Sequence, residues 1–281
     1  MQKLYIENSV LNRGPFASLS NLIELRLTNI SELFVDENTF SKHPNLESLE
    51  LSSHTSAFYG IHNLKSNAFS NLNALTTLKL AGNFANLISQ KLAKNLHKLE
   101  CLELDLNAHD FALSIEHFKS IKQLKKLTIK GHQMKFDCRA FQHLTHLAEL
   151  CLFDEVTFVN VDVGDIWQCV RNLERLRIGK YSSERLNGDH YEYAENQLTV
   201  SKNNLMKHQI SQLVHLKNLK LMLTQSDLAA YQQMLAKQKQ ANTAPTNYDL
   251  CRYILKDLTN LTVLDLSDCG LKQINRALFS N

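Results

Sequence analysis

One spacing of apolar residues recurs along this chain and constrains its fold more than any other feature. In the stretch FQHLTHLAELCL, residues 141–152, the apolar positions are Phe141, Leu144, Leu147, Leu150 and Leu152. They are separated by three gaps of three residues and then one gap of two. A continuous helix does not end on a gap of two, and a continuous strand does not hold gaps of three. The unit therefore predicts a turn-forming segment that leads directly into a short strand.

The same spacing returns in tandem, in close copies such as FASLSNLIELRL (16–27), FSNLNALTTLKL (69–80) and FKSIKQLKKLTI (118–129). We define the repeat positions as the last apolar residue of each copy, and shorter matches add Ile6 and Val200. The repeat positions are Ile6, Leu27, Leu51, Leu80, Leu104, Ile129, Leu152, Ile178, Val200, Leu221 and Leu266. Successive positions lie 21 to 29 residues apart, except for a last interval of 45 residues. Such a period is typical of a solenoid, in which each coil buries its apolar face only against its neighbours.

On these residues the chain resembles the leucine-rich repeat family from end to end. The LxxLxL block and its period match the family, and a phenylalanine six residues before the block resembles the typical repeats of Toll-like receptor ectodomains. In the family, an Asn or Cys stands three residues after the repeat position. Here that residue is Asn83, Asn107, Asn203 or Cys269 in four coils, and in six others it is Ile30, His54, His132, Glu155, Tyr181 or Thr224. The resemblance implies an α/β horseshoe with a parallel sheet on the concave face and helices and irregular turns on the convex face. It also implies a recognition function without catalysis.

We expect a single leucine-rich repeat domain over residues 1–281, with about eleven coils and no capping modules. The segment at about 225–256 is longer than one coil, and its apolar spacing predicts two helices, one from Ser226 and one around Leu250 and Ile254. It is either a lengthened coil or an insertion that helps to bind a partner. The polar, tyrosine-rich stretch 181–193 is open to the same two interpretations. Because both ends stop within the repeat pattern, we expect a fragment or a truncated gene product.

Outward-facing positions of the predicted strands define a candidate binding surface on the concave face. Stacking places Lys79 beside Glu103, Asp105 beside Lys130, and Glu149 between Lys126 and Arg175. These charges either satisfy one another across the strands or recognise a charged protein surface. Arg175 and Arg177, with Phe153 expected to be exposed nearby, are the strongest candidates for a binding hot spot. The candidate partner-binding residues are Lys79, Glu103, Asp105, Lys126, Lys130, Glu149, Phe153, Arg175 and Arg177.

No motif points to a catalytic, cofactor or metal site. The chain has no GxxxxGK[ST], GxGxxG or GxSxG sequence. HLTH at 143–146 lacks the glutamate of a zinc-protease helix. None of the six cysteines forms a CxxC pair, and the stacking places Cys101 and Cys151 two strands apart, too far for a disulfide. We therefore expect no enzyme activity, no cofactor and no metal.

Charge and hydropathy bear on the partner and the compartment. The net charge is only +3, from 31 basic and 28 acidic residues, which predicts neither a nucleic-acid nor a membrane partner. No apolar run approaches the roughly 18 residues of a membrane span. The expected partner is another protein of unknown identity, and the resemblance slightly favours an extracellular receptor ectodomain. The alternatives are an intracellular scaffold or adaptor, which fits the missing signal peptide and unpaired cysteines, and the substrate-recognition arm of a ubiquitin ligase.

Overall fold

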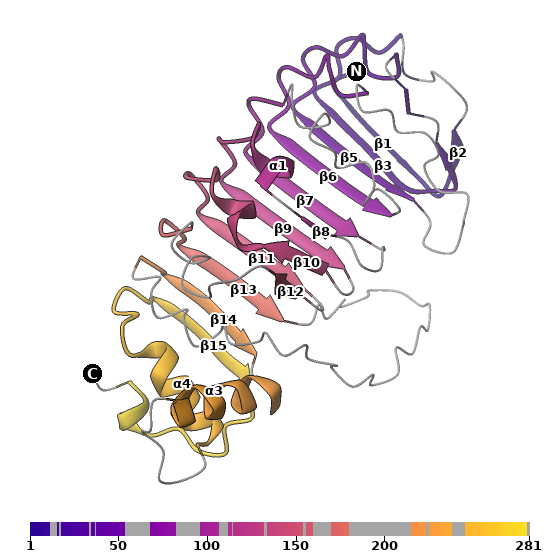
Figure 1. Ribbon diagram of the computed structural model, residues 1–281. Helices are drawn as coiled ribbons and strands as arrows, with labels where there is room; N and C mark the ends of the chain where they lie inside the picture. Colours follow the sequence, from indigo (N-terminus) through magenta and orange to yellow (C-terminus); the bar gives the residue numbers. More distant parts are fainter. Residues whose placement is uncertain are drawn as a thin grey trace.

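A computed structural model shows a solenoid built on one ten-stranded parallel sheet (Figure 1). The structure describes residues 1–11, 16, 18–33, 35–36, 38–53, 68–82, 96–106, 112–113, 115–131, 134–153, 156–159, 170–179, 215–222, 225–237 and 245–279. The strands follow one another in sequence order across the sheet, so that each coil contributes one strand beside the last. The leucine-rich repeat architecture expected from the apolar spacing is therefore confirmed.

The repeat positions align across the sheet. Ile6 pairs with Leu27, Leu27 with Leu51, and the same register continues strand by strand to Leu221. The strands are β1 (Lys3–Glu7), β3 (Glu24–Ile30), β5 (Ser48–Ser53), β6 (Thr77–Gly82), β7 (Cys101–Leu106), β9 (Lys126–Gly131), β11 (Glu149–Phe153), β13 (Arg175–Gly179), β14 (Asn218–Met222) and β15 (Val263–Asp268). Because both inward residues of each strand meet their counterparts, the leucines form one continuous core.

Ten strands of the sheet lie within the described residues, one at each repeat position except Val200. β13 pairs directly with β14, and the amide of Lys217 bonds the carbonyl of Glu174 at 2.8 Å; the equivalent bond is present between each of the other neighbouring strands. Val200 itself, like the tyrosine-rich stretch 181–193, falls outside the described residues.

The gaps of three arise from consecutive tight turns that cross from the convex side to the sheet. In one coil the amide of Leu144 bonds the carbonyl of Phe141, and the amide of Leu147 bonds the carbonyl of Leu144. Each turn directs its first residue inward, which is why an apolar residue is required at every third position. The phenylalanines that start the turns are fully buried and contact those of adjacent coils, with Phe118 and Phe141 6.0 Å apart between ring centroids.

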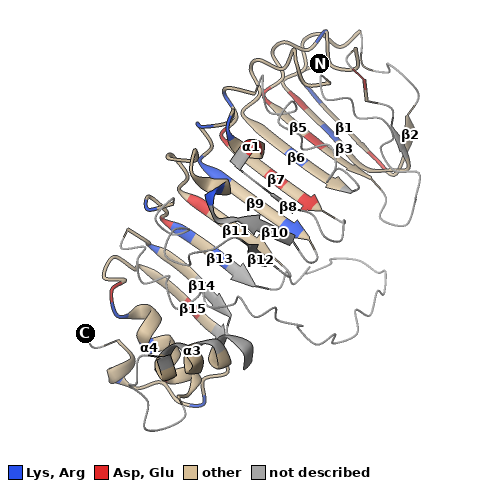
Figure 2. Ribbon diagram, in the orientation of Figure 1, with Lys and Arg blue, Asp and Glu red and all other residues tan. Residues whose placement is uncertain are grey.

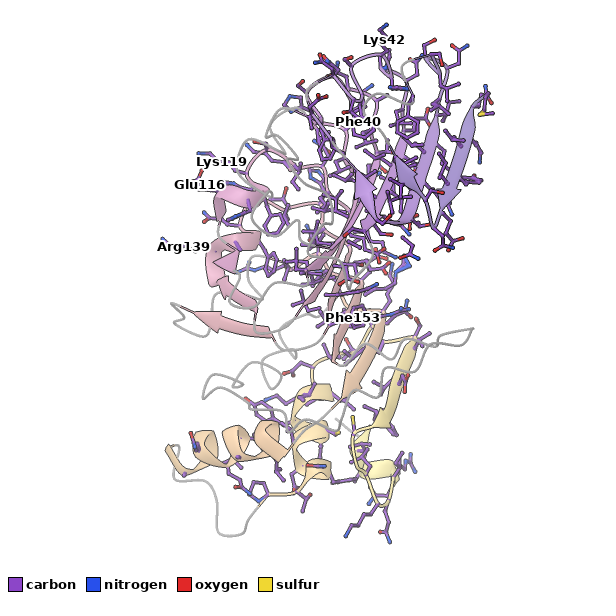
Figure 3. All side chains as sticks on the ribbon, turned by 90° about the vertical axis from the view of Figure 1, so that its right-hand side faces the viewer. Phe40, Lys42, Glu116, Lys119, Arg139 and Phe153 are labelled. Carbon is purple, nitrogen blue, oxygen red and sulfur yellow. The ribbon has the colours of Figure 1, made fainter. Side chains whose placement is uncertain are left out.

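Short elements, including strands that the sequence did not predict, cover the side opposite the sheet. β8 (Ala112–Leu113), β10 (Met134–Asp137) and β12 (Val156–Val159) form a second parallel sheet, and β2 (Val10–Leu11) pairs with β4 (Glu32–Leu33). The helical pieces described there are a single turn, α1 (Ile115–Phe118), and a 3₁₀ turn, η3 (Cys138–Phe141). Figure 3 shows Glu116, Lys119 and Arg139 on this outer side, with Phe40 in the interior and Lys42 pointing away from it.

Two helices fill the long interval before the last strand, as the apolar spacing of the segment at about 225–256 predicted. α3 (Gln225–Lys237) and α4 (Asn247–Leu255) lie at the C-terminal end of the sheet (Figure 1). They meet through Tyr231 and Tyr253, whose ring centroids are 5.3 Å apart. Thr246 and Asp249 form a capping box that starts α4. A 3₁₀ turn, η5 (Arg276–Leu278), packs against α4.

Candidate binding surface on the sheet

The sheet places all nine predicted surface residues on five neighbouring strands, from β6 to β13. The register puts Lys79 opposite Glu103, Asp105 opposite Lys130, and Glu149 opposite both Lys126 and Arg175. Figure 2 shows the acidic and basic positions alternating from strand to strand along this part of the sheet. The predicted neighbours are therefore confirmed as neighbours, whereas their role in binding stays a prediction.

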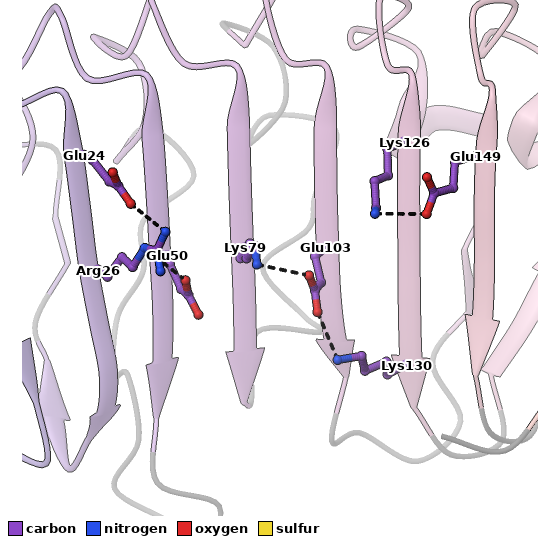
Figure 4. Close-up of polar contacts among 8 residues, drawn as sticks. All are labelled: Glu24, Arg26, Glu50, Lys79, Glu103, Lys126, Lys130 and Glu149. Carbon is purple, nitrogen blue, oxygen red and sulfur yellow. Dashed lines mark hydrogen bonds and ion pairs between the residues drawn. The ribbon is translucent and has the colours of Figure 1, made fainter. Parts of the chain in front are cut away.

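The Glu103 carboxylate forms ion pairs with a lysine on each neighbouring strand (Figure 4). Nζ of Lys130 lies 2.9 Å from Oε1, and Nζ of Lys79 lies 3.6 Å from Oε2. Burial of Glu103 by itself would raise its pKa, but the hydrogen bond from Lys130 and the charges of both lysines outweigh burial and lower the pKa. Glu103 is therefore a carboxylate whose charge is satisfied within the sheet.

Glu149 is the second acidic centre. Nζ of Lys126 lies 2.9 Å from its Oε1 and Nε of Arg175 lies 3.6 Å from its Oε2. Burial would raise the pKa of Glu149, but the hydrogen bond from Lys126, with the charges of Lys126, Arg175 and Arg177, holds it below the usual range. The hydrogen bond to Glu149 in turn raises the pKa of Lys126. The sequence left open whether these charges pair with one another or bind a charged partner surface. The pairs around Glu103 and Glu149 do pair with one another across the strands.

Between the two acidic centres the sheet carries short neutral side chains. Thr128 and Cys151 are opposite each other in the register and are almost fully buried, although they are on the open face of the sheet. The flanking long charged side chains cover them. Burial raises the pKa of the Cys151 and Cys101 thiols, so neither is an activated nucleophile. Both are free, on strands separated by β9, as the stacking predicted.

Arg177 differs from the other basic residues of the mosaic. Its side chain is exposed on β13, and no carboxylate of the described residues lies within 4.0 Å of its guanidinium. Arg175, two residues earlier, is paired with Glu149. Phe153, predicted to be exposed, is half-buried at the end of β11, opposite Gly179 (Figure 3).

Two further features were not singled out from the sequence. At the start of the sheet, Glu24 is buried between Lys3, at 3.0 Å, and Arg26, at 2.7 Å, and the Arg26 guanidinium stacks on Tyr5. Where β13, β14 and β15 begin, a shallow polar pocket of about 530 Å³ opens at the edge of the sheet. The pocket is lined by Asn172, Glu174, His215, Lys217, Asn260 and Thr262. Exposed polar residues before a strand carry no sequence signal that separates a pocket from an ordinary turn.

The part of the chain that the structure describes contains no cluster of three or more His, Cys, Asp or Glu side chains able to hold a metal ion. Among the same residues, none of the helices has the length and apolarity that crossing a membrane requires. His143 and His146 lie on a turn ahead of β11, with His143 half-buried and His146 exposed.

Comparisons with known proteins agree with the architecture. No protein-family model matches the chain, and no curated protein matches it in sequence. Three solved structures are similar over most of its length. The TLR13–ssRNA13 complex has a TM-score of 0.60 at 19% identity, covering 95% of this chain and 36% of that one. The mouse RP105/MD-1 complex has a TM-score of 0.57 at 18% identity, covering 95% and 42%. The Drosophila Toll–Spatzle complex has a TM-score of 0.51 at 18% identity, covering 92% and 31%.

The present chain thus spans between about a third and two fifths of the length of these proteins. At such low identities the likeness concerns the fold alone. It agrees with the aligned leucines, the consecutive turns and the strand order described above. In its fold the chain is a leucine-rich repeat solenoid.

Proposed function

We propose that this chain is a non-catalytic recognition module that binds another protein on the open face of its sheet. The contact is centred on Arg177, with Arg175 and Phe153 beside it on β13 and β11. Arginine and aromatic residues dominate binding hot spots in protein interfaces. The expected partner surface carries at least one carboxylate, which a guanidinium binds in a bidentate geometry.

The observation that carries this proposal is the contrast between Arg177 and the rest of the mosaic. Lys79, Lys126 and Lys130 already have carboxylate partners within the sheet, so binding a partner through them would first require breaking an internal ion pair. Arg177 forms no ion pair with a carboxylate of the described residues, so no such pair has to be broken before it binds a partner. An exposed cation next to a half-buried aromatic ring supports a compact contact of mixed polar and apolar character.

The finer assignment is a receptor-like or innate-immune recognition protein. Two of the similar structures are complexes of a solenoid with another protein, RP105 with MD-1 and Toll with Spatzle, and the latter is described as a hub in development and innate immunity. The buried phenylalanines that start the turns, which we call the phenylalanine spine, support the same branch of repeats; they are Phe16, Phe40, Phe69, Phe118 and Phe141. The intracellular scaffold remains the alternative, and the thiol state of the protein in its native source separates the two compartments.

Affinity capture with three matched baits tests the proposal. The baits are the unaltered chain, Arg177→Glu, and Arg252→Glu, which reverses an exposed arginine on α4 away from the sheet. Proteins retained by each bait are quantified by mass spectrometry. We expect at least one protein to be retained by the unaltered chain and by Arg252→Glu, and to be lost from Arg177→Glu.

A folding control makes the outcome decisive. Circular dichroism of the three baits shows whether each is folded, so that a loss of binding is not a loss of structure. If every specifically retained protein is retained equally by the Arg177→Glu bait, the partner uses another face, and the proposal is wrong.

A further inference from the structure

Two cysteines outside the binding surface meet at the C-terminal end of the solenoid. Cys251 lies in α4 and Cys269 lies just after β15, and the side chains of both are completely buried. Neither cysteine is in a disulfide, and the two side chains are close enough for Cys269 to raise the pKa of Cys251. They are 18 positions apart in sequence (269 − 251), on two separate elements.

A backbone contact holds the two elements together at this point. The side-chain amide of Asn247 donates a hydrogen bond to the carbonyl oxygen of Cys269 at 2.9 Å. Asn247 is one helical turn before Cys251, so both side chains leave the same face of α4. Gly270, which follows Cys269, has a left-handed backbone with φ of +61°, and a Cβ there would lie 3.0 Å from the Asn247 amide nitrogen. The close approach of α4 to the Cys269 turn is therefore built into the fold.

From this geometry we infer that Cys251 and Cys269 form a disulfide that fastens α4 to the turn after β15 when the chain folds in an oxidising compartment. A thiol–disulfide pair such as glutathione supplies the oxidant. A thiolate of one cysteine attacks oxidised glutathione and releases one glutathione thiol, leaving a mixed disulfide. The second cysteine, after losing its proton, displaces the remaining glutathione. Two protein thiols are oxidised and one glutathione disulfide is reduced to two thiols.

The surroundings determine when this bond forms. The neighbouring Cys269 side chain, together with burial, raises the pKa of Cys251, so the attacking thiolate is scarce in the folded chain. Exchange is therefore slow once α4 has docked, and the bond forms as α4 folds onto the turn. Cys101 and Cys151 have no such neighbour across the sheet, since β9 separates their strands.

Refolding the full chain from denaturant in two glutathione buffers, one reduced and one oxidised, tests this inference. Free thiols are blocked by alkylation after an acid quench, and the protein is digested for mass spectrometry. We expect a peptide pair joined through Cys251 and Cys269 from the oxidised buffer only, lighter than its free parts by two hydrogen atoms. The same pair is expected from a Cys101→Ser, Cys151→Ser double variant, and its absence from Cys251→Ala serves as the control.

The unaltered chain decides the test even if Cys251→Ala does not fold. Oxidised protein should unfold at a higher temperature than reduced protein, because the cross-link restricts the unfolded chain. If Cys251 and Cys269 are both still alkylated after refolding in the oxidised buffer, or if either is joined to another cysteine instead, the inference is overturned. This readout does not involve a binding partner, so it fails or succeeds independently of the proposed recognition function.

Discussion

Lys130 bonds Glu103 across the strand pair β7–β9, although the residue directly opposite Lys130 in the register is Asp105. The Nζ–Oε1 distance is 2.9 Å, and the Glu103 carboxylate is also within 3.6 Å of Lys79. Glu103 therefore links three strands, β6, β7 and β9, through one side chain (Figure 4). A charge cluster of this kind holds its own side chains in place and offers little to a partner.

Replacing Glu103 by glutamine is expected to lower the free energy of unfolding by about 1 kcal/mol at pH 7, because two lysine contacts weaken together. Glu50→Gln is the matched control, since Glu50 has the same 27% exposed side chain but, among the described residues, a single ion pair, at 3.8 Å to Arg26. Urea denaturation of the three proteins measures the difference. A loss as large for Glu50→Gln as for Glu103→Gln would show that the double pairing carries no extra stability.

The same substitution predicts a pH dependence with a definite sign. The pKa of Glu103 is lowered in the folded state, so its stabilising contribution is complete above the unfolded value of about 4.3 and is lost as the pH falls through the folded value. The difference between the unaltered chain and Glu103→Gln should therefore shrink below about pH 5. Urea midpoints measured from neutral to acid pH test this, and a difference that grows on acidification contradicts it.

His43 is the one fully buried histidine of the described residues, and it stands where other copies have leucine, isoleucine or valine. Its Nε2 is 3.0 Å from the carbonyl oxygen of Phe16 in the preceding coil, to which it donates a hydrogen bond. His43→Ala should lower the free energy of unfolding by about 2–4 kcal/mol. His43→Leu should cost only about 1 kcal/mol, since it keeps the volume but leaves the Phe16 carbonyl without its donor. Thermal and urea unfolding measure both, with exposed Lys42→Ala as a control that should change nothing.

The phenylalanine spine is expected to contribute more than any surface pair. Phe118 is fully buried and contacts Phe141 of the next coil at 6.0 Å between centroids. Phe118→Ala should lower the free energy of unfolding by about 3–5 kcal/mol, because a cavity remains between two coils. The adjacent Lys119→Ala removes only an exposed ion pair with Glu116 and should stay within about 0.5 kcal/mol. Equal effects of the two changes would contradict the role assigned to the spine.

The start of α4 depends on the capping box of Thr246. Its hydroxyl accepts a hydrogen bond from the Asp249 amide, and the Asp249 carboxylate accepts one from the Thr246 amide. Thr246→Ala should lower the free energy of unfolding by about 1 kcal/mol and weaken the docking of Cys251 against Cys269. The exposed Thr259→Ala is the control. Amide hydrogen exchange over residues 247–255 should accelerate in Thr246→Ala alone.

Much of the fold could be predicted because its signal is local and repeated. Each LxL pair marks its own strand, and the stacking of coils then fixes the register without further information. Val200 was counted from the triplet LTV alone, without the apolar turns that precede the other strands, and it lies outside the described residues. The convex strands β8, β10 and β12 are four residues long or less, too short for an alternating pattern to be distinguished from chance.

The surface could be predicted only in part. The register placed Lys130 beside Asp105, as the structure confirms, and the long lysine side chain also reaches Glu103 on the diagonal, which the register alone did not indicate. Phe153 was expected to be exposed from its outward position, whereas it is half-buried. The contact of Cys251 with Cys269 joins a helix to a turn beyond the next strand, and no periodic pattern in the sequence relates the two.

Arg177, on the open face of the sheet, is the residue that we propose contacts a protein partner. Calorimetric titration of a captured and purified partner into the unaltered chain, Arg177→Glu and Arg252→Glu tests this contact. We expect a dissociation constant at least about tenfold higher for Arg177→Glu, a loss of about 1.4 kcal/mol, and no change for Arg252→Glu. Equal affinities for all three proteins, or equal weakening by both charge reversals, would contradict it.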